Sequence, residues 1–106
     1  MTSFKKREDG FEKKFAHDEA LRFKASARRN KKLGLWAAEK LGKSGAAADS
    51  YAGEVIAADM EEAGDEDVFR KLRRDFDAAG IAQSDHQIRR TMDELMAVAI
   101  AEIKTS

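Results

Sequence analysis

The sequence predicts an all-α fold: a small four-helix bundle with a mobile N-terminal arm. Apolar residues recur at helical spacing in four segments, glycines separate these segments, and no stretch alternates as a strand does. The chain has 106 residues and no proline, so only glycine interrupts a helix from within. We expect residues 1–17 to form the arm and residues 18–106 to form a four-helix domain with one modest core.

The first 17 residues differ from the rest of the chain. They are densely charged and contain Gly10, yet Phe4, Phe11 and Phe15 would share one stripe if the segment became helical. A flexible amphipathic segment that folds in the groove of a partner uses such recurring apolar anchors. A frayed terminus explains the pattern equally well, so spacing alone leaves both interpretations open.

The longest helix is predicted over about residues 18–41, with Gly42 as its terminator. Its expected inner face contains Phe23, Ala27, Leu33, Ala37, Ala38 and Leu41. Gly34 lies on that face, where a glycine costs about 1 kcal/mol of helix propensity relative to alanine. A close crossing with another helix is the usual compensation, and we expect one at this position.

A second, alanine-rich helix is predicted over about residues 49–63, stopped by Gly64. Asp59 falls on its apolar side, where an unpaired carboxylate would be costly. We therefore expect Asp59 to pair with a cation of the bundle.

Two further helices have clear boundary signals. Asp65 is the expected N-cap of the third, acidic residues occupy its first turn, and Gly80 ends it. The last helix is predicted over about residues 85–103, because Ser84 and Gln87 have the spacing of a capping box.

Charge is divided along the chain although the net charge is zero. Residues 1–43 hold 13 basic and 6 acidic side chains, residues 44–69 hold 8 acidic and no basic ones, and the remainder is nearly balanced. Opposite blocks attract, so antiparallel packing of the first two helices is expected. The chain has no cysteine and no apolar run long enough to cross a bilayer, which favours a cytoplasmic protein without membrane insertion.

Catalysis is not expected from this sequence. Only His17 and His86 are available as histidine bases, and neither belongs to a nucleophilic constellation. The acidic residues between positions 59 and 67 lack the glycine spacing of a calcium loop, and helix ends explain them better. We expect no metal site and no cofactor, so the chain should bind a partner macromolecule rather than act as an enzyme.

A cationic face on the long helix offers a second binding feature. It contains Lys24, Arg28, Lys31 and Lys32, flanked by Arg22 and Arg29. A solvated face and a nucleic-acid interface are both compatible with it, although zero net charge and the acidic block argue against nucleic acid. Leu35 is expected on the same face, and an apolar residue among cations favours a docking patch for a protein.

Four motifs occur in a characteristic order along the chain. They read Lys14-Phe-Ala-His-Asp18, Ala27-Arg-Arg-Asn30, Leu33-Gly-Leu-Trp-Ala-Ala38 and Gly64-Asp-Glu-Asp-Val68. In this order and spacing they closely resemble the zeta subunit of alphaproteobacterial F-type ATP synthases, over essentially the whole chain. The resemblance implies a four-helix bundle with a mobile N-terminal arm.

The resemblance also implies a function. In that family the arm inserts at an alpha/beta interface of the ATP synthase head, near the central stalk, becomes helical and blocks ATP hydrolysis. The positions that match the inhibitory segment are Phe4, Arg7, Glu8, Glu12, Lys14 and Phe15. The implied partners are the alpha, beta and central-stalk subunits, at the periphery of the inner membrane. Weak nucleotide binding at the basic helix is a further expectation.

Three positions depart from the family pattern. Lys5 and Lys6 stand where the pattern has acidic residues, and Gly10 interrupts a stretch that is expected to become helical. The helix cost of a glycine, about 1 kcal/mol, corresponds to roughly fivefold in binding. Weaker inhibition is therefore expected from this chain.

Overall fold

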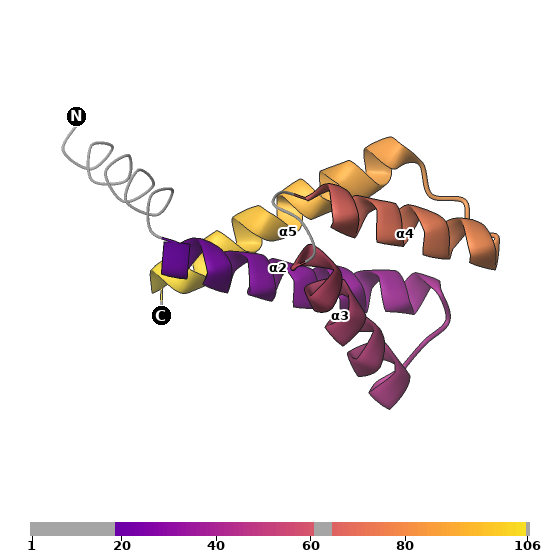
Figure 1. Cartoon of the computed structure of the whole chain (residues 1–106), viewed down its shortest axis with the longest axis horizontal. Coiled ribbons are helices and arrows are strands. Elements are labelled where there is room, and N and C mark those ends of the chain that lie inside the picture. The colour runs from indigo at the N-terminus through magenta and orange to yellow at the C-terminus, as the bar shows by residue number, and fades with distance from the viewer. Residues whose placement is uncertain (1–18, 61–64, 106) are drawn as a thin grey trace.

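The computed structural model describes residues 19–60 and 65–105 and contains four α-helices there (Figure 1). They are α2 (Glu19–Lys40), α3 (Gly45–Asp59), α4 (Glu66–Ala79) and α5 (Asp85–Thr105). These two ranges contain no strand, which confirms the prediction of an all-α fold. The predicted arm, residues 1–17, and the predicted terminator Gly64 lie outside the described residues.

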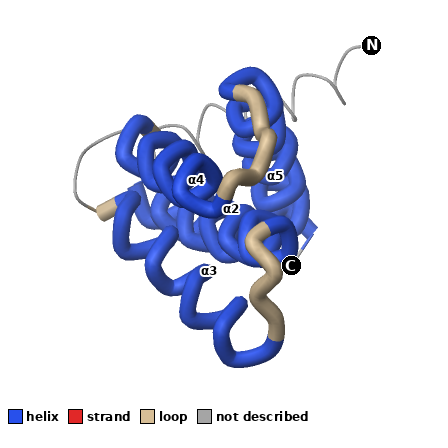
Figure 2. The backbone as a smooth tube through the Cα atoms, turned by 90° about the vertical axis from the view of Figure 1, so that its right-hand side faces the viewer, coloured by secondary structure: helices blue, strands red, loops and turns tan. Residues whose placement is uncertain are grey.

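The helices form two hairpins, one made of α2 and α3 and the other of α4 and α5. Figure 1 shows α3 running back obliquely across α2, and α4 and α5 joined by a short loop on the other side. α2 packs against both α3 and α5, while α4 packs against α3 and α5. Seen end-on in Figure 2, α2 lies between the other three helices, so it organises the bundle.

The core is drawn from all four helices. Its buried members are Leu33, Ala37, Ala38, Tyr51, Val55, Val68, Leu72, Phe76, Ile88 and Met92. The rings of Trp36 and Phe76 meet edge to face with centroids 5.8 Å apart, which joins α2 to α4. Aromatic and branched side chains from α4 and α5 therefore close over the small residues of α2.

The expected close crossing occurs at Gly34. A Cβ atom placed on Gly34 would lie 2.5 Å from the Cα of Ala52 and 3.0 Å from its Cβ. No real Cβ tolerates such a contact with backbone, so only glycine lets α2 and α3 approach this closely. The crossing fixes the relative position of the two helices whose charges are opposite.

The predicted capping box of α5 and the predicted glycine terminator of α4 are confirmed, whereas the Asp65 side chain at the start of α4 makes no capping hydrogen bond. The Ser84 hydroxyl accepts from the Gln87 amide at 3.1 Å, and the Gln87 side chain accepts from the Ser84 amide at 3.0 Å, which completes the capping box. Gly80 ends α4 in the left-handed conformation, with φ of 71°. α5 continues to Thr105, two residues beyond the predicted end.

Two predictions about the first helices are wrong. α3 begins at Gly45 rather than near position 49, because the alanines that follow Gly45 favour the helix strongly. Phe23, expected on the inner face of α2, is 61% exposed. The buried positions of α2 instead follow a four-residue spacing through Ala25, Arg29, Leu33 and Ala37, and Phe23 lies off this line.

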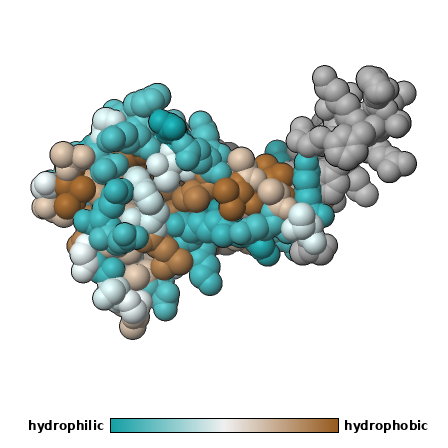
Figure 3. Space-filling model, turned by 180° about the vertical axis from the view of Figure 1, so that it is seen from behind, coloured by the Kyte–Doolittle hydropathy of each residue, from teal (hydrophilic) through white to brown (hydrophobic). Residues whose placement is uncertain are grey.

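Some apolar surface stays uncovered. The large exposed hydrophobic side chains of the described residues are Phe23, Leu35, Met60 and Val98. Figure 3 shows hydrophobic side chains in a band across the middle of one face, with hydrophilic side chains on both sides. Contiguous apolar surface of this kind is typical of sites that bind other molecules.

Candidate functional site

The predicted docking patch lies in one groove, which we call the α2 groove. It has a volume of about 820 Å³ and is lined from α2, α3 and α5 by Phe23, Lys24, Ala27, Arg28, Lys31, Lys32, Leu35, Ile56, Glu102 and Ile103. All five patch residues, Lys24, Arg28, Lys31, Lys32 and Leu35, are among them. Sequence reasoning missed the contributions of Ile56 and Ile103, because they come from distant segments.

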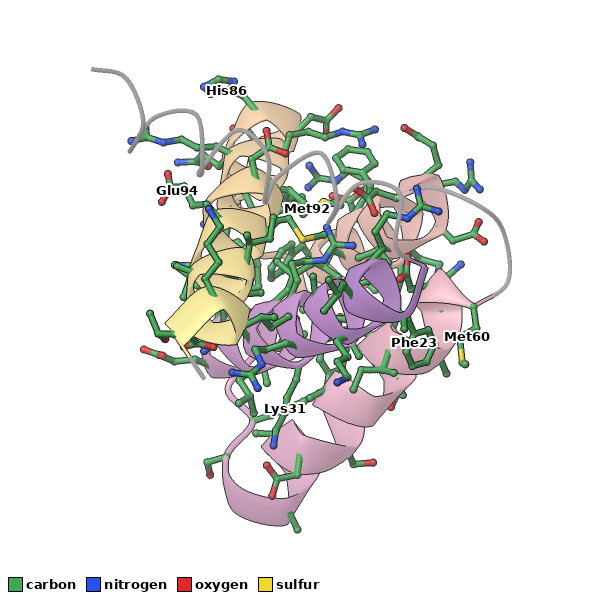
Figure 4. All side chains as sticks on the ribbon, turned by 90° about the vertical axis from the view of Figure 1, so that its left-hand side faces the viewer. Phe23, Lys31, Met60, His86, Met92 and Glu94 are labelled. Atoms are coloured by element: carbon green, nitrogen blue, oxygen red, sulfur yellow. The ribbon has the colours of Figure 1, made fainter. Side chains whose placement is uncertain are left out.

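Two side chains at the α2 groove point outward. Figure 4 shows the Lys31 side chain extending away from the α2 ribbon and Phe23 on the outer surface of the helix. Leu35 is 37% exposed, as expected for the outward face. The groove therefore combines an aromatic ring, aliphatic side chains and cations within reach of a binding partner.

Two of the four cations of the α2 groove bind a carboxylate of the same chain, and the other two do not pair with a described residue. Glu102 of α5 accepts from Lys32 at 2.9 Å and from Arg28 at 3.2 Å, which ties α5 to α2. The hydrogen bond from Lys32 lowers the pKa of the Glu102 carboxyl below its ordinary value. Lys24 and Lys31 form no ion pair with any described residue.

Arg29 does not belong to the cationic face, contrary to expectation. Its side chain is 1% exposed and its Nη2 donates to Asp65 Oδ1 at 2.8 Å, while its Nε donates to Asn30 Oδ1 at 2.6 Å. Asn30 in turn donates to Asp59 Oδ2 at 2.9 Å, and Arg29 Nη2 lies 4.0 Å from Asp59 Oδ1. The expected pairing of Asp59 is confirmed, and Arg29 is its cation.

This polar cluster joins two of the sequence motifs. Arg29 and Asn30 come from the Ala27-Arg-Arg-Asn30 motif, and Asp65 comes from the Gly64-Asp-Glu-Asp-Val68 motif. Asp65 is the N-cap of α4 by position, but its side chain makes no capping hydrogen bond because it binds Arg29 instead. The motifs therefore fix how α2, α3 and α4 meet.

A second polar cluster joins α3 to α4. The Tyr51 hydroxyl donates to Asp75 Oδ2 at 2.7 Å, and Lys71 donates to Asp75 at 3.0 Å and to Glu54 at 2.9 Å. Burial, together with the hydrogen bond to Asp75, raises the pKa of Tyr51 above its ordinary value. These contacts stabilise the helix pair and share no residue with the α2 groove.

The described residues offer little for catalysis or metal binding. His86 is exposed in the first turn of α5, and His17 lies outside the described residues. Across residues 19–60 and 65–105, no group of three His, Cys, Asp or Glu side chains is placed to hold a metal ion. In the same ranges no helix has the length and hydrophobicity needed to span a bilayer.

A family model described as ATPase inhibitor subunit zeta matches residues 1–102. The chain belongs to this family. Membership confirms the resemblance carried by the four motifs and describes an inhibitor subunit of an ATPase. One solution NMR structure is 50% identical, covers 80% of this chain and 96% of that chain, and has a TM-score of 0.71. The comparison with curated proteins gave no match.

The zeta-family match extends over the predicted inhibitory segment. Its candidate contact residues are Phe4, Arg7, Glu8, Glu12, Lys14 and Phe15. All six lie outside the described residues, so their role in contacting a partner stays a prediction. The residues that line the α2 groove all belong to the described part of the chain.

Proposed function

We propose that this chain inhibits ATP hydrolysis by the F-type ATP synthase through its N-terminal segment, residues 1–17. The observation that carries the proposal is membership of the zeta family over residues 1–102, a range that includes this whole segment. The segment inserts at an alpha/beta interface of the catalytic head near the central stalk and becomes helical there. The protein thus acts at the periphery of the inner membrane, on its cytoplasmic side.

The composition of the segment supports this mechanism. Phe4 and Phe15 supply apolar anchors that bury their rings in the interface, and the charged side chains between them supply polar contacts at its rim. A segment that folds as it binds loses conformational entropy, which weakens binding relative to a preformed helix. An additional contact from the helical domain would raise the effective concentration of the segment at its site.

The helical domain is suited to hold the segment from outside the interface. The crossing of Gly34 with Ala52 and the buried Arg29 cluster fix α2, α3 and α4 against one another. The described part of α2 starts at Glu19, two positions after the last residue of the proposed inhibitory segment. When the domain is bound to a partner, a rigid helix at this position holds the adjoining segment close to its own binding site.

The contacts of the cationic face favour a protein partner over a nucleic acid. Arg28 and Lys32 share the carboxylate of Glu102, and Arg29 is buried, so only part of the expected cationic face is available to a phosphate backbone. Weak nucleotide binding at this face stays a prediction.

The experiment is a measurement of ATP hydrolysis by the purified cognate catalytic head with increasing amounts of the full chain. We expect the intact chain to inhibit, and the Phe4→Ala/Phe15→Ala variant to lose most of the inhibition. Met60→Ala is the matched control, because Met60 is an exposed apolar side chain of the helical domain. Equal inhibition by the double variant and the intact chain would rule out the proposed role of the segment.

A further inference from the structure

We infer that the α2 groove binds an acidic amphipathic helix of the partner protein. The inference rests on the proposed function, because it names the chemistry of the contact through which the helical domain anchors the inhibitory segment. It concerns surface residues of α2, α3 and α5 and none of residues 1–17.

The first step is the apolar lining of the groove. Phe23 is 61% exposed, and Leu35, which lies a little over three turns further along α2, is also exposed. Ile56 of α3 and Ile103 of α5 line the groove from its two sides. An exposed aromatic ring next to aliphatic side chains gains free energy when a partner's apolar side chains cover it.

The second step is the shape of the groove. Its lining residues on α2 extend from Phe23 to Leu35, which corresponds to about 18 Å along the helix axis. α3 and α5 supply one or two residues each along its flanks. An elongated groove with apolar side chains in its lining fits a helix that presents apolar residues three and four positions apart.

The third step is the pattern of charge. Glu102 already binds Arg28 and Lys32, whereas Lys24 and Lys31 form no ion pair with a described residue. Lys24 and Lys31 are seven positions apart in the sequence, so they lie about two turns, or about 10 Å, apart on the same side of α2. Two carboxylates seven residues apart on a docked helix match this spacing.

The same pattern argues against a nucleic acid in the groove. A phosphate backbone gains from a continuous row of free cations, but here the middle of the row is paired with a carboxylate. The apolar lining residues Leu35, Ile56 and Ile103 offer nothing to phosphate. A helix that is apolar on one face and acidic at its edge would cover the apolar lining of the groove and pair with Lys24 and Lys31.

The test uses the full chain and two synthetic helical peptides of about 15 residues. The acidic peptide has leucines at helical spacing and two glutamates seven positions apart, and the control peptide has lysines in place of the glutamates. Each is titrated into the labelled chain while amide chemical shifts are recorded. We expect the acidic peptide to move signals of the α2 groove residues and the lysine peptide to leave them unchanged.

Two charge-reversal variants locate the contact. Lys24→Glu/Lys31→Glu should weaken binding of the acidic peptide about tenfold, because two attractive pairs become repulsive. Lys43→Glu/Arg74→Glu is the matched control, since these cations line other surfaces, and its affinity should stay unchanged. The far-ultraviolet circular dichroism of both variants should match that of the parent, because all four side chains are exposed.

The inference is overturned if millimolar acidic peptide moves no signal of the α2 groove, if both peptides bind equally, or if both variants lose affinity equally. None of these results affects the proposed inhibition, which is measured by ATP hydrolysis with the Phe4→Ala/Phe15→Ala variant. Conversely, loss of the proposed inhibition leaves the peptide titration interpretable. The two claims therefore fail separately.

Discussion

Gly34 of α2 lies against Ala52 of α3 so closely that an added Cβ would come within 2.5 Å of the Ala52 Cα. The contact is with backbone, which cannot rotate away as a flexible side chain can. The approach of the two helices at this point therefore depends on the absence of a side chain, and with it the packing of the core that α2 shares with α3.

Gly34→Ala should destabilise the protein by about 2 kcal/mol, even though alanine favours a helix by about 1 kcal/mol, because the helices must move apart. Urea unfolding measures this difference. Gly53→Ala is the control, since an added Cβ there meets no atom within 4 Å. That variant should gain up to about 1 kcal/mol, and equal effects at both glycines would contradict the crossing.

Arg29 is predicted to be the most costly charged residue of α2 to remove. Arg29→Met removes the donor to Asn30 Oδ1 and the cation beside Asp59, and should lower the free energy of unfolding by about 3 kcal/mol. Asp65→Ala should cost less, about 1 kcal/mol, because its side chain is 49% exposed. Chemical denaturation measures the free energy of unfolding of both variants. A smaller loss for Arg29→Met than for Asp65→Ala would contradict the burial of Arg29.

Tyr51 predicts a loss of stability at alkaline pH. Burial, followed by the hydrogen bond to Asp75, raises the pKa of Tyr51 above its ordinary value of 10.0, so the folded chain holds the phenolic proton more tightly than the unfolded chain. The contribution of the neutral Tyr51 side chain to the free energy of unfolding is complete below pH 10. It is lost as pH rises, by about 1 kcal/mol at pH 11.

The measurement for Tyr51 is urea unfolding at several pH values, with Tyr51→Phe as the comparison. Burial lowers the pKa of Lys71, but hydrogen bonds to Glu54 and Asp75 outweigh it and raise that pKa, so the stability that Lys71 contributes is also lost as pH rises. The difference between parent and variant isolates Tyr51. If the free energy of unfolding falls with pH equally in both proteins, the fold does not raise the pKa of Tyr51.

Gly10 is predicted to limit inhibition. If residues 1–17 become helical on binding, Gly10→Ala removes a helix cost of about 1 kcal/mol and should lower the concentration for half-maximal inhibition about fivefold. Titration of ATP hydrolysis with both chains measures this ratio. Gly53→Ala, which adds the same methyl group to α3, should leave the inhibitory concentration unchanged. A weaker inhibitor from Gly10→Ala would argue against a helical bound segment.

Local signals predicted much of the fold. The capping box of Ser84 with Gln87 and the terminator Gly80 act within a few residues, so the sequence shows them directly. Gly34 and Asp59 each break the apolar pattern of their own helix, which predicted a close helix crossing at Gly34 and a cation beside Asp59. The structure contains both.

Other features depend on contacts between distant segments. Arg29 lies on the buried line of α2 because Asp59 and Asp65 reach it from elsewhere, and charge alone suggested exposure. Phe23 is apolar, which suggested burial, but it stays 61% exposed because α3, α4 and α5 leave it uncovered. The α2 groove could be predicted only in part, because its cations share a helix face whereas Ile56 and Ile103 reach it through the packing of α3 and α5.

The most direct measurement of the central claim is ATP hydrolysis by the cognate catalytic head with the intact chain and with a chain that begins at residue 18. The circular dichroism of the shortened chain verifies its helices beforehand. The account predicts that the intact chain inhibits hydrolysis and that the shortened chain does not. Undiminished hydrolysis with the intact chain, or equal inhibition by both chains, would contradict it.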